Sequence, residues 1–298
     1  MCGIVGLFLK DPKLEPKLGE MLTEMLITMT DRGPDSAGIA IYSGARPGLG
    51  KITVQSPEPE DDFRDLDADL HAAIGQPVAL LVKSSHAVIE VPLAQLEAAR
   101  TALRHLRPGL KVMSSGGSIE IFKEVGLPKD VAARFELSKM AGTHGIGHTR
   151  MATESAVTTM GAHPFSTGSD QCLVHNGSLS NHNGLRRELI RMGMTFETQN
   201  DTEVAAAYVS QKLKEGEDLG KALESGLEDL DGFFTFVVGT RNGFGVVRDP
   251  IACKPAVMAE TDAYVAFGSE YRALVSLPGI ETARVWEPEP ATVYFWER

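Results

Sequence analysis

The chemically most reactive side chain near the start of the sequence is Cys2, and the apolar residues after it predict a strand over Cys2–Phe8. Removal of Met1 would leave Cys2 with a free α-amine beside its thiol, and in model peptides these two groups have pKa values of roughly 7.7–8.0 and about 8.5. One residue would then supply both a nucleophile and a base suited to neutral pH. The alternative interpretation is a small buried cysteine at the start of a strand.

The segment His175-Asn176-Gly177 follows the strand-like residues Cys172–Val174 and offers groups that a negatively charged intermediate needs. Asn176 carries a side-chain N–H, and Gly177 allows its backbone N–H to approach a ligand closely. Together they could form an oxyanion hole for a nucleophile such as Cys2. The alternative is an Asn-Gly hairpin turn, which is the common structural use of that dipeptide.

Two charged residues could anchor a polar substrate. Arg150 could make a two-pronged contact with a carboxylate, and Asp201 could bind an ammonium group. The alternatives are a surface or structural ion pair for Arg150 and a helix N-cap for Asp201. A nucleophile combined with one cation and one anion suits a substrate that is an amino-acid zwitterion.

Several histidines raise the possibility of a metal-binding module, with His144, His148 and His163 as its ligands and His175 further on. The segment from His144 to His148 contains two glycines and is a poor helix, so the two imidazoles need not share a face. No CxxC or HExxH pattern is present. We therefore expect no metal site.

Composition and charge narrow the classes of function. The chain has 298 residues, 43% of them hydrophobic, and a net charge of −11, which disfavours nucleic acid as a partner. The early apolar run Ile4–Leu9 is too short for a signal peptide or a membrane span, so no membrane partner is expected. Three scattered cysteines (Cys2, Cys172 and Cys253) are too few for a disulfide framework, which favours a cytoplasmic location.

The elements that must position these residues occur in clusters. A helix is predicted over about 14–30 and a strand over Ile39–Tyr42, and helices are predicted over Val204–Lys214 and Leu219–Leu230. Antiparallel strands are predicted over Phe233–Gly239, Gly243–Arg248, Ala256–Ala259 and Tyr264–Phe267. Grouped strands and grouped helices favour an α+β sandwich over a doubly wound parallel sheet.

The middle of the chain differs from the rest. Residues 43–76 are rich in Gly, Pro and acidic residues and are predicted to form a loop or a hinge. Residues 77–140 have the pattern of a small α/β unit. Its predicted strands are Val78–Val82, Ala87–Val91, Lys111–Met113 and Ser118–Phe122, and its predicted helix is Leu93–Leu106.

Taken together, six segments resemble the glutaminase domain of class II glutamine amidotransferases, which are N-terminal-nucleophile (Ntn) hydrolases. The segments are Cys2-Gly3-Ile4-Val5-Gly6, Arg32-Gly33-Pro34-Asp35-Ser36-Ala37-Gly38, Gly147-His148-Thr149-Arg150, Ala162-His163-Pro164, His175-Asn176-Gly177 and Asp201-Thr202-Glu203. Their order and spacing match as well. The resemblance implies one domain over residues 1–298, a four-layer α/β/β/α sandwich with an α/β subdomain inserted at about 43–141.

The resemblance also implies a role for each site residue. Cys2 would attack the side-chain amide of glutamine with its own α-amine as proton carrier, and Asn176 and Gly177 would stabilise the oxyanion. Arg150 would hold the α-carboxylate with Thr153 beside it, and Asp201 would hold the α-ammonium. Ammonia would leave, and water would hydrolyse the thioester to glutamate.

The size and the insertion are most similar to the small amidotransferase subunit of glutamate-synthase-like enzymes, including N-methylglutamate synthase. Such a subunit implies no cofactor in this chain, an FMN and iron–sulfur synthase subunit as partner, and a second partner with a glycine-rich β-helix. We expect a separate partner because 298 residues leave no room for a synthase domain.

Two alternatives keep the same fold. One is a catalytically silent assembly or regulatory subunit, since Met151 replaces a usual aromatic residue and Glu154 a frequent histidine. The other is hydrolysis of a different amide such as that of asparagine, because Arg150 and Asp201 would read only the zwitterion.

Overall fold

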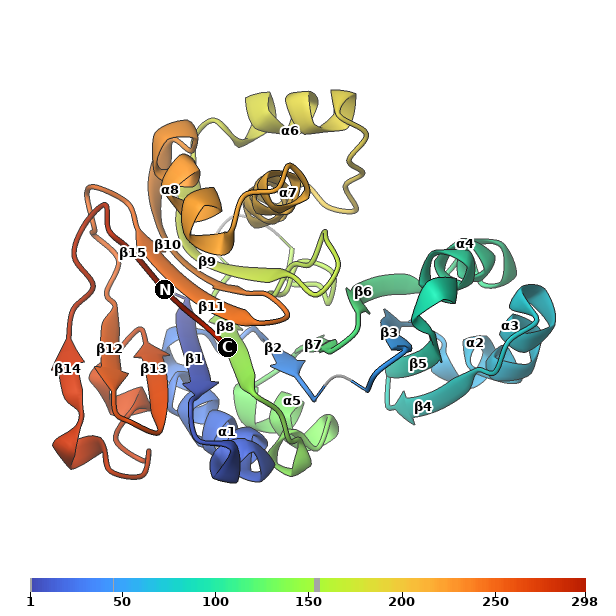
Figure 1. Cartoon of the computed structure of the whole chain (residues 1–298), viewed down its shortest axis with the longest axis horizontal. Coiled ribbons are helices and arrows are strands. Elements are labelled where there is room, and N and C mark those ends of the chain that lie inside the picture. The colour runs from blue at the N-terminus through green and yellow to red at the C-terminus, as the bar shows by residue number, and fades with distance from the viewer. Residues whose placement is uncertain (1, 45, 153–155) are drawn as a thin grey trace.

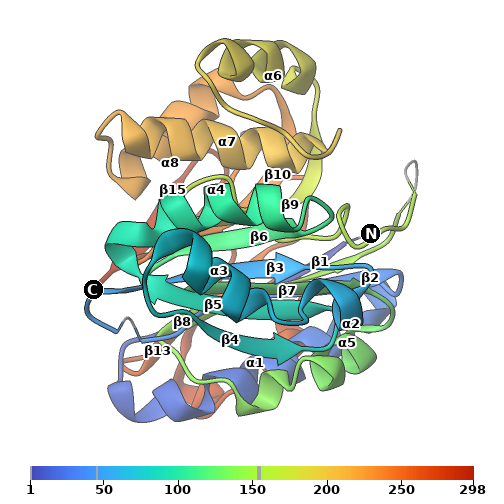
Figure 2. The ribbon, with the colours of Figure 1, turned by 90° about the vertical axis from the view of Figure 1, so that its right-hand side faces the viewer.

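Two stacked β-sheets with helices on their outer faces form the body of the protein (Figure 1). The computed structural model describes residues 2–44, 46–152 and 156–298. Figure 2 shows the layers in order, from α7 and α8 through the two sheets to α1 and α5. This is the predicted α/β/β/α arrangement. No helix among the described residues is long and apolar enough to cross a membrane.

The larger sheet has seven strands and carries the start of the chain near its centre. Its strands, in spatial order, are β14 (Arg284–Trp286), β12 (Val257–Glu260), β13 (Tyr264–Gly268), β1 (Gly3–Leu9), β8 (His144–Arg150), β2 (Ser36–Tyr42) and β7 (Ile119–Val125). Helices α1 (Leu18–Thr28) and α5 (Pro128–Arg134) cover its outer face. The predicted helix over 14–30 begins as a 3-10 turn because Pro16 lacks a backbone N–H, and regular α-helix starts at Leu18.

The smaller sheet has four strands, with β9 at one edge. Its strands, in spatial order, are β15 (Val293–Glu297), β11 (Gly243–Arg248), β10 (Gly232–Gly239) and β9 (Cys172–Leu179). Helices α7 (Asp201–Lys214) and α8 (Leu219–Asp229) lie over its outer face, and α6 (His182–Arg191) packs against α7. Buried apolar side chains such as Ile4, Val174 and Phe244 fill the space between the two sheets.

The insertion forms a third sheet beside the body (Figure 1). Its strands, in spatial order, are β4 (Ala79–Lys83), β5 (His86–Pro92), β3 (Leu49–Gln55) and β6 (Lys111–Gly116), with helices α2 (Pro59–Asp62), α3 (Leu66–Ile74) and α4 (Leu96–Leu106). The inserted unit covers a shorter stretch of sequence than the expected insertion at 43–141, because β7 and α5 belong to the body. The prediction that residues 43–76 form a loop or a hinge is wrong, because β3 and α3 lie within them.

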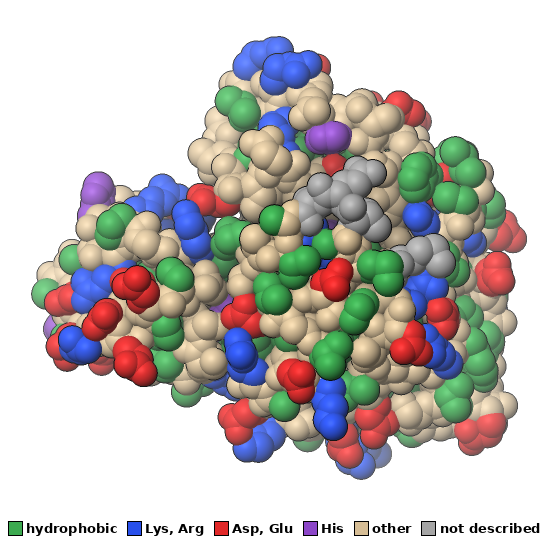
Figure 3. Space-filling view, turned by 180° about the vertical axis from the view of Figure 1, so that it is seen from behind, with side chains coloured by type: hydrophobic (Ala, Val, Ile, Leu, Met, Phe, Trp, Pro, Cys, Tyr) green, Lys and Arg blue, Asp and Glu red, His purple; other side chains and the backbone are tan. Residues whose placement is uncertain are grey.

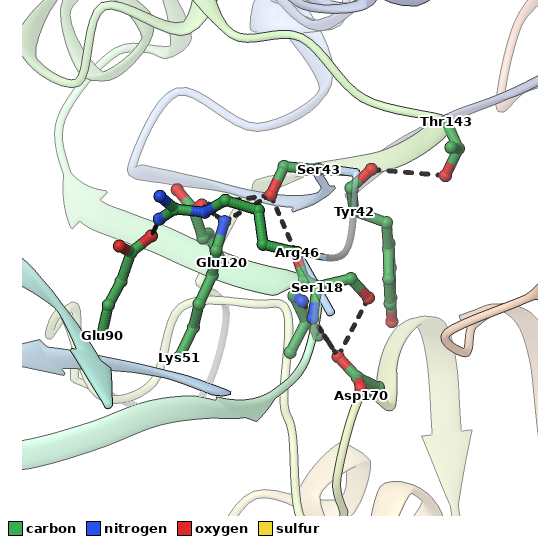
Figure 4. Close-up of polar contacts among 10 residues, drawn as sticks. Tyr42, Ser43, Arg46, Lys51, Glu90, Ser118, Glu120, Thr143 and Asp170 are labelled. Carbon is green, nitrogen blue, oxygen red and sulfur yellow. Dashed lines mark hydrogen bonds and ion pairs between the residues drawn. The ribbon is translucent and has the colours of Figure 1, made fainter. Parts of the chain in front are cut away.

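Polar contacts tie the insertion to the body where the chain enters and leaves it (Figure 4). The Lys51 ammonium donates to Glu120 Oε1 at 2.5 Å and to Ser43 Oγ at 2.6 Å. Asp170, two residues before β9, accepts hydrogen bonds from the backbone N–H groups of Gly117 and Ser118 at 2.7 and 2.8 Å. The turn between β6 and β7 is therefore fixed to the segment that leads into β9.

Candidate active site

Cys2 lies at the end of the larger sheet where β8 also ends. In the antiparallel pairing of β1 with β8, Gly3 faces Thr149, so Cys2 is at the same end as Arg150. The carbonyl oxygen of Cys2 accepts hydrogen bonds from Arg32 Nε at 2.9 Å and from Asn176 Nδ2 at 3.3 Å. The start of the chain is thus held by the strand ladder and by two side chains from other elements.

Arg32 is the contact that sequence reasoning missed. Its motif was part of the resemblance, but the sequence alone assigned it no role. Arg32 is 7% exposed, and its Nη1 pairs with Glu270 Oε1 at 2.7 Å. The hydrogen bond from Arg32 holds the pKa of Glu270 below its usual value. The sequence shows only that Arg32 is a cation in a segment rich in turn-forming residues. Which groups it contacts could not be predicted without the fold.

The residues after Arg32 hold the end of β8. A Cβ on Gly33 would lie 2.3 Å from the carbonyl carbon of Thr149, so only glycine allows this close approach. Asp35 donates its backbone N–H to the Arg150 carbonyl at 3.0 Å and accepts from Ala152 N through its carboxylate at 2.7 Å. The Gly33-Pro34-Asp35 segment therefore sets where β8 stops and where Arg150 is placed.

Asn176 and Gly177 lie inside β9, so the hairpin-turn alternative is wrong. They face Thr235 and Phe234 of β10 in a regular antiparallel ladder. Gly177 has a φ of +148°, and a Cβ there would lie 1.9 Å from the Phe233 carbonyl oxygen. The buried Asn176 amide donates to the Cys2 carbonyl oxygen, so this predicted oxyanion donor lies beside the predicted nucleophile.

Asp201 is the first residue of α7, and Asn200 is the N-cap, which overturns the N-cap alternative for Asp201. The Asn200 side chain accepts from the Thr202 N–H at 2.8 Å. The Asp201 carboxylate instead accepts from Leu179 N at 2.9 Å and lies 3.7 Å from His175 Nδ1. Burial alone would raise the pKa of Asp201, but His175 and the Leu179 N–H lower it to about 2. The carboxylate is therefore available as an anion.

Arg150 ends β8 and is 6% exposed. Its Nη1 donates to the Ala156 carbonyl at 3.3 Å, in the loop that follows. Met151 is partly exposed next to it. Thr153 and Glu154, also predicted to lie in this region, are outside the described residues.

The histidines connect the elements that carry the two charged anchors. His148 Nε2 donates to the His175 carbonyl oxygen at 3.2 Å, because a carbonyl oxygen can only accept. The His148 and His163 rings stack with centroids 4.1 Å apart. His163 Nε2 and His175 Nδ1 both contact the Thr202 hydroxyl, at 2.7 and 3.1 Å. A buried path thus runs from β8 to the start of α7.

The metal hypothesis finds no support in this arrangement. Residues 144–150 form a strand, so His144 and His148 share a face, but their rings do not converge. His144 stacks on Tyr42 with centroids 4.0 Å apart, whereas His148 stacks on His163. Burial lowers the pKa of both His144 and His148 to about 3, so both are neutral. In the described part of the chain, no three or more His, Cys, Asp or Glu side chains are grouped to hold a metal ion.

Comparison with known proteins identifies the family. A family model described as a glutamine amidotransferase domain matches residues 148–276. The chain is 71% identical over 297 residues to the glutamine amidotransferase-like protein GlxB of Rhizobium meliloti, covering 100% of this chain and 98% of that protein. The chain belongs to the glutamine amidotransferase family. A putative glutamine amidotransferase of Methanothermobacter thermautotrophicus is 36% identical over 312 residues, with both chains fully covered.

The fold of this amidotransferase matches a solved structure described as the allosteric regulatory enzyme of purine biosynthesis. The TM-score is 0.65 at 20% identity, covering 99% of this chain and 47% of that one. The likeness shows the Ntn-type, class II fold. The predicted family, enzyme class and fold are therefore confirmed, and the reaction that the family implies is hydrolysis of the glutamine amide with transfer of ammonia.

Asp201→Asn is expected to raise the KM for glutamine by about 10- to 150-fold. The substitution removes a charge-assisted contact worth about 1.5–3 kcal/mol while keeping the size of the side chain. Because the pKa of Asp201 is about 2, the carboxylate stays ionised as the pH falls from 8 to 5, and this residue adds no pH dependence to KM there. Steady-state kinetics at several pH values check both points. An unchanged KM in the variant would contradict the assignment.

Proposed function

We propose that Cys2, exposed as the N-terminal residue by removal of Met1, hydrolyses the side-chain amide of glutamine and supplies the ammonia to a separate synthase subunit. The observation that supports this most directly is the pair of hydrogen bonds from Arg32 and Asn176 to the Cys2 carbonyl, at 2.9 and 3.3 Å. They hold the nucleophile next to an amide N–H that can serve the oxyanion.

In the proposed reaction, the α-amine of Cys2 takes the thiol proton and Sγ bonds to the amide carbon of glutamine. The negative charge on the former carbonyl oxygen is stabilised by Asn176 Nδ2–H and the Gly177 backbone N–H. Collapse of this intermediate breaks the carbon–nitrogen bond, and the ammonium of Cys2 returns its proton to the departing nitrogen. The same amine then takes a proton from water, which hydrolyses the thioester and releases glutamate.

Substrate orientation is assigned to the two charged anchors. Arg150 holds the α-carboxylate and Asp201 the α-ammonium, and we retain Thr153 as a substrate-binding residue beside Arg150. These groups recognise any amino-acid zwitterion, so the length of the side chain is a separate question. Comparison of kcat/KM for glutamine and asparagine answers it, and a preference for asparagine would contradict the proposal.

The state of the N-terminus decides between an active enzyme and a silent subunit. Mass spectrometry of the protein from its native host should show that Met1 is absent, and the same sample should release ammonia from glutamine. Retention of Met1 would leave Cys2 without a free α-amine and would favour the assembly or regulatory role.

We further propose that the partner is a synthase of the glutamate-synthase-like or N-methylglutamate synthase type that carries FMN and an iron–sulfur cluster. Ammonia released into water takes up a proton, so a donor of this kind should work in contact with its acceptor. Hydrophobic side chains gather near the middle of the face shown in Figure 3. Val125 at the end of β7, Leu127 two residues later and Val157 in the loop after β8 are 42–45% exposed, and we call these three residues the apolar rim.

Affinity capture from the native host tests the partner and locates its contact. Asp substitutions at Leu127 and Val157 should abolish capture of the FMN and iron–sulfur subunit if the apolar rim is the contact. The matched control places Asp at Leu81 and Val82, which are 56% and 50% exposed on β4 of the insertion. Loss of capture only in the control would place the contact on the insertion, and capture of no synthase subunit by the unaltered protein would contradict the partner proposal.

A further inference from the structure

One buried cation has no part in the reaction described above. Lys123 lies on β7 and is 3% exposed. Its Nζ donates to the carbonyl oxygens of Met160, Ala162 and Pro164 at 3.3, 2.7 and 3.2 Å. It also lies 4.4 Å from the centre of the Phe165 ring. All three ammonium protons are thus directed at one short segment of the chain.

We propose that Lys123 is a positioning residue for glutamine binding, because its ammonium fixes the loop on which both substrate anchors depend. The loop consists of residues 156–165 and is called here the anchor loop. The inference rests on the proposed roles of Arg150 and Asp201. Lys123 itself touches neither of these residues nor Cys2 in any contact that the structure describes.

The first side of the anchor loop supports Arg150. The Ala156 carbonyl accepts from Arg150 Nη1 at 3.3 Å. A Cβ on Gly161 would lie 3.3 Å from the same nitrogen, so the backbone at Gly161 packs closely against the guanidinium. A shift of this loop would therefore move the group proposed to bind the α-carboxylate.

The second side of the anchor loop supports the start of α7. The His163 ring stacks on His148, and its Nε2 lies 2.7 Å from the Thr202 hydroxyl. Thr202 is next to Asp201 and also contacts His175, the residue that lies 3.7 Å from the Asp201 carboxylate. The same loop therefore reaches the group proposed to bind the α-ammonium.

The anchor loop packs against the larger sheet next to Lys123. Lys123 faces Gly38 of β2 in the strand pairing. A Cβ on Gly38 would lie 1.9 Å from the His163 carbonyl oxygen and 2.6 Å from the Lys123 Cβ. Because Gly38 has no side chain, the loop can approach the sheet closely enough for the Lys123 ammonium to reach the three carbonyl oxygens.

The three carbonyl acceptors match the charged form of Lys123. An ammonium has three N–H donors for three carbonyl acceptors, whereas a neutral amine has only two. Burial lowers the pKa of Lys123 to about 7, against the opposing effect of the Glu203 carboxylate. An uncharged replacement of similar size cannot donate to these carbonyl oxygens, so it should release the loop while it still fills most of the space.

Lys123→Met tests the inference, with Lys83→Met as the matched control. Lys83 is on β4, and its Nζ contacts the Phe135 carbonyl at 3.5 Å, away from the anchor loop. We expect Lys123→Met to raise the KM for glutamine at least about 10-fold with kcat changed less than about 3-fold, the effect of losing a charge-assisted contact worth about 1.5 kcal/mol. Hydrogen exchange should accelerate in residues 156–165 and not across the whole chain. The control should leave both quantities unchanged.

Two further variants keep the test decisive. Lys123→Arg retains the charge and should give a smaller rise in KM than Lys123→Met. If Lys123→Met does not fold, Thr159→Ala removes the loop's hydrogen bond to Glu124 and should raise KM without changing kcat. Unchanged KM and exchange in an active protein would overturn the role of Lys123 alone, whereas the absence of any glutaminase activity in the unaltered protein would contradict the proposed function.

Discussion

Cys2→Ala is expected to abolish the release of ammonia from glutamine, lowering kcat by at least about 10⁴-fold. The substitution removes the atom proposed to bond with the substrate, and the other two cysteines, Cys172 and Cys253, are not part of the proposed site. The backbone of residue 2 keeps its hydrogen bonds to Arg32 and Asn176, because both use the carbonyl oxygen. Folding and glutamine binding should therefore survive, so the loss falls on the chemical step. Ammonia release under saturating glutamine measures it.

Cys253→Ala is the control for that result, since Cys253 is an exposed cysteine that takes no part in the proposed site. It should release ammonia at the rate of the unaltered protein. The buried Cys172 would be a poor control, because its side chain packs between the sheets next to Tyr42. Equal ammonia release from Cys2→Ala and from the unaltered protein would remove Cys2 from the mechanism.

The parts of the fold that could be predicted are those whose sequence pattern is local. The strands between residues 232 and 268 are apolar runs separated by turn residues, and the structure places them where they were expected. The helices α7 and α8 also follow from their apolar spacing. In these segments the burial pattern and the local propensity agree, so no tertiary information is needed.

β3 shows why the insertion was harder to predict. Its polar residues Lys51, Thr53 and Gln55 alternate with Ile52 and Val54, and all five side chains are buried. On the polar face, Lys51 donates to Ser43, which is 8 residues away, and to Glu120, which is 69 residues away in the sequence. An ion pair with a residue as distant as Glu120 cannot be inferred from the local sequence, so the polar residues of this strand look like those of a loop.

The site also has a part that could be predicted from the sequence and a part that could not. The chemical types of Cys2, Asn176, Arg150 and Asp201 were sufficient to propose them, since each offers a group that the reaction needs. Their surroundings were not predictable: Asn200 rather than Asp201 caps α7, and Gly177 lies in a strand rather than in a turn. Arg32 and Lys123 act through backbone carbonyls, which every residue has. No sequence pattern marks such partners, so only the fold could identify these contacts.

Asn176→Ala is expected to lower kcat by about 10²–10³-fold with little change in the KM for glutamine, because it removes one oxyanion-hole donor. The Asn176 amide contacts the substrate most strongly when charge develops on the oxygen, so kcat and kcat/KM should fall together. The substitution leaves the Arg32 hydrogen bond to the Cys2 carbonyl in place. Steady-state kinetics with glutamine distinguish this loss from one in substrate binding.

Asn242→Ala is the matched control, since Asn242 is exposed in the turn between β10 and β11, at the opposite end of the sheet from Asn176. It should keep both kinetic constants. A rise in KM at constant kcat in Asn176→Ala would mean that Asn176 binds the ground state and that the Gly177 N–H alone serves the oxyanion. A large fall in kcat therefore distinguishes the oxyanion role from a purely structural one. A residue that only held the Cys2 backbone would share that function with Arg32, so its removal would lower kcat less.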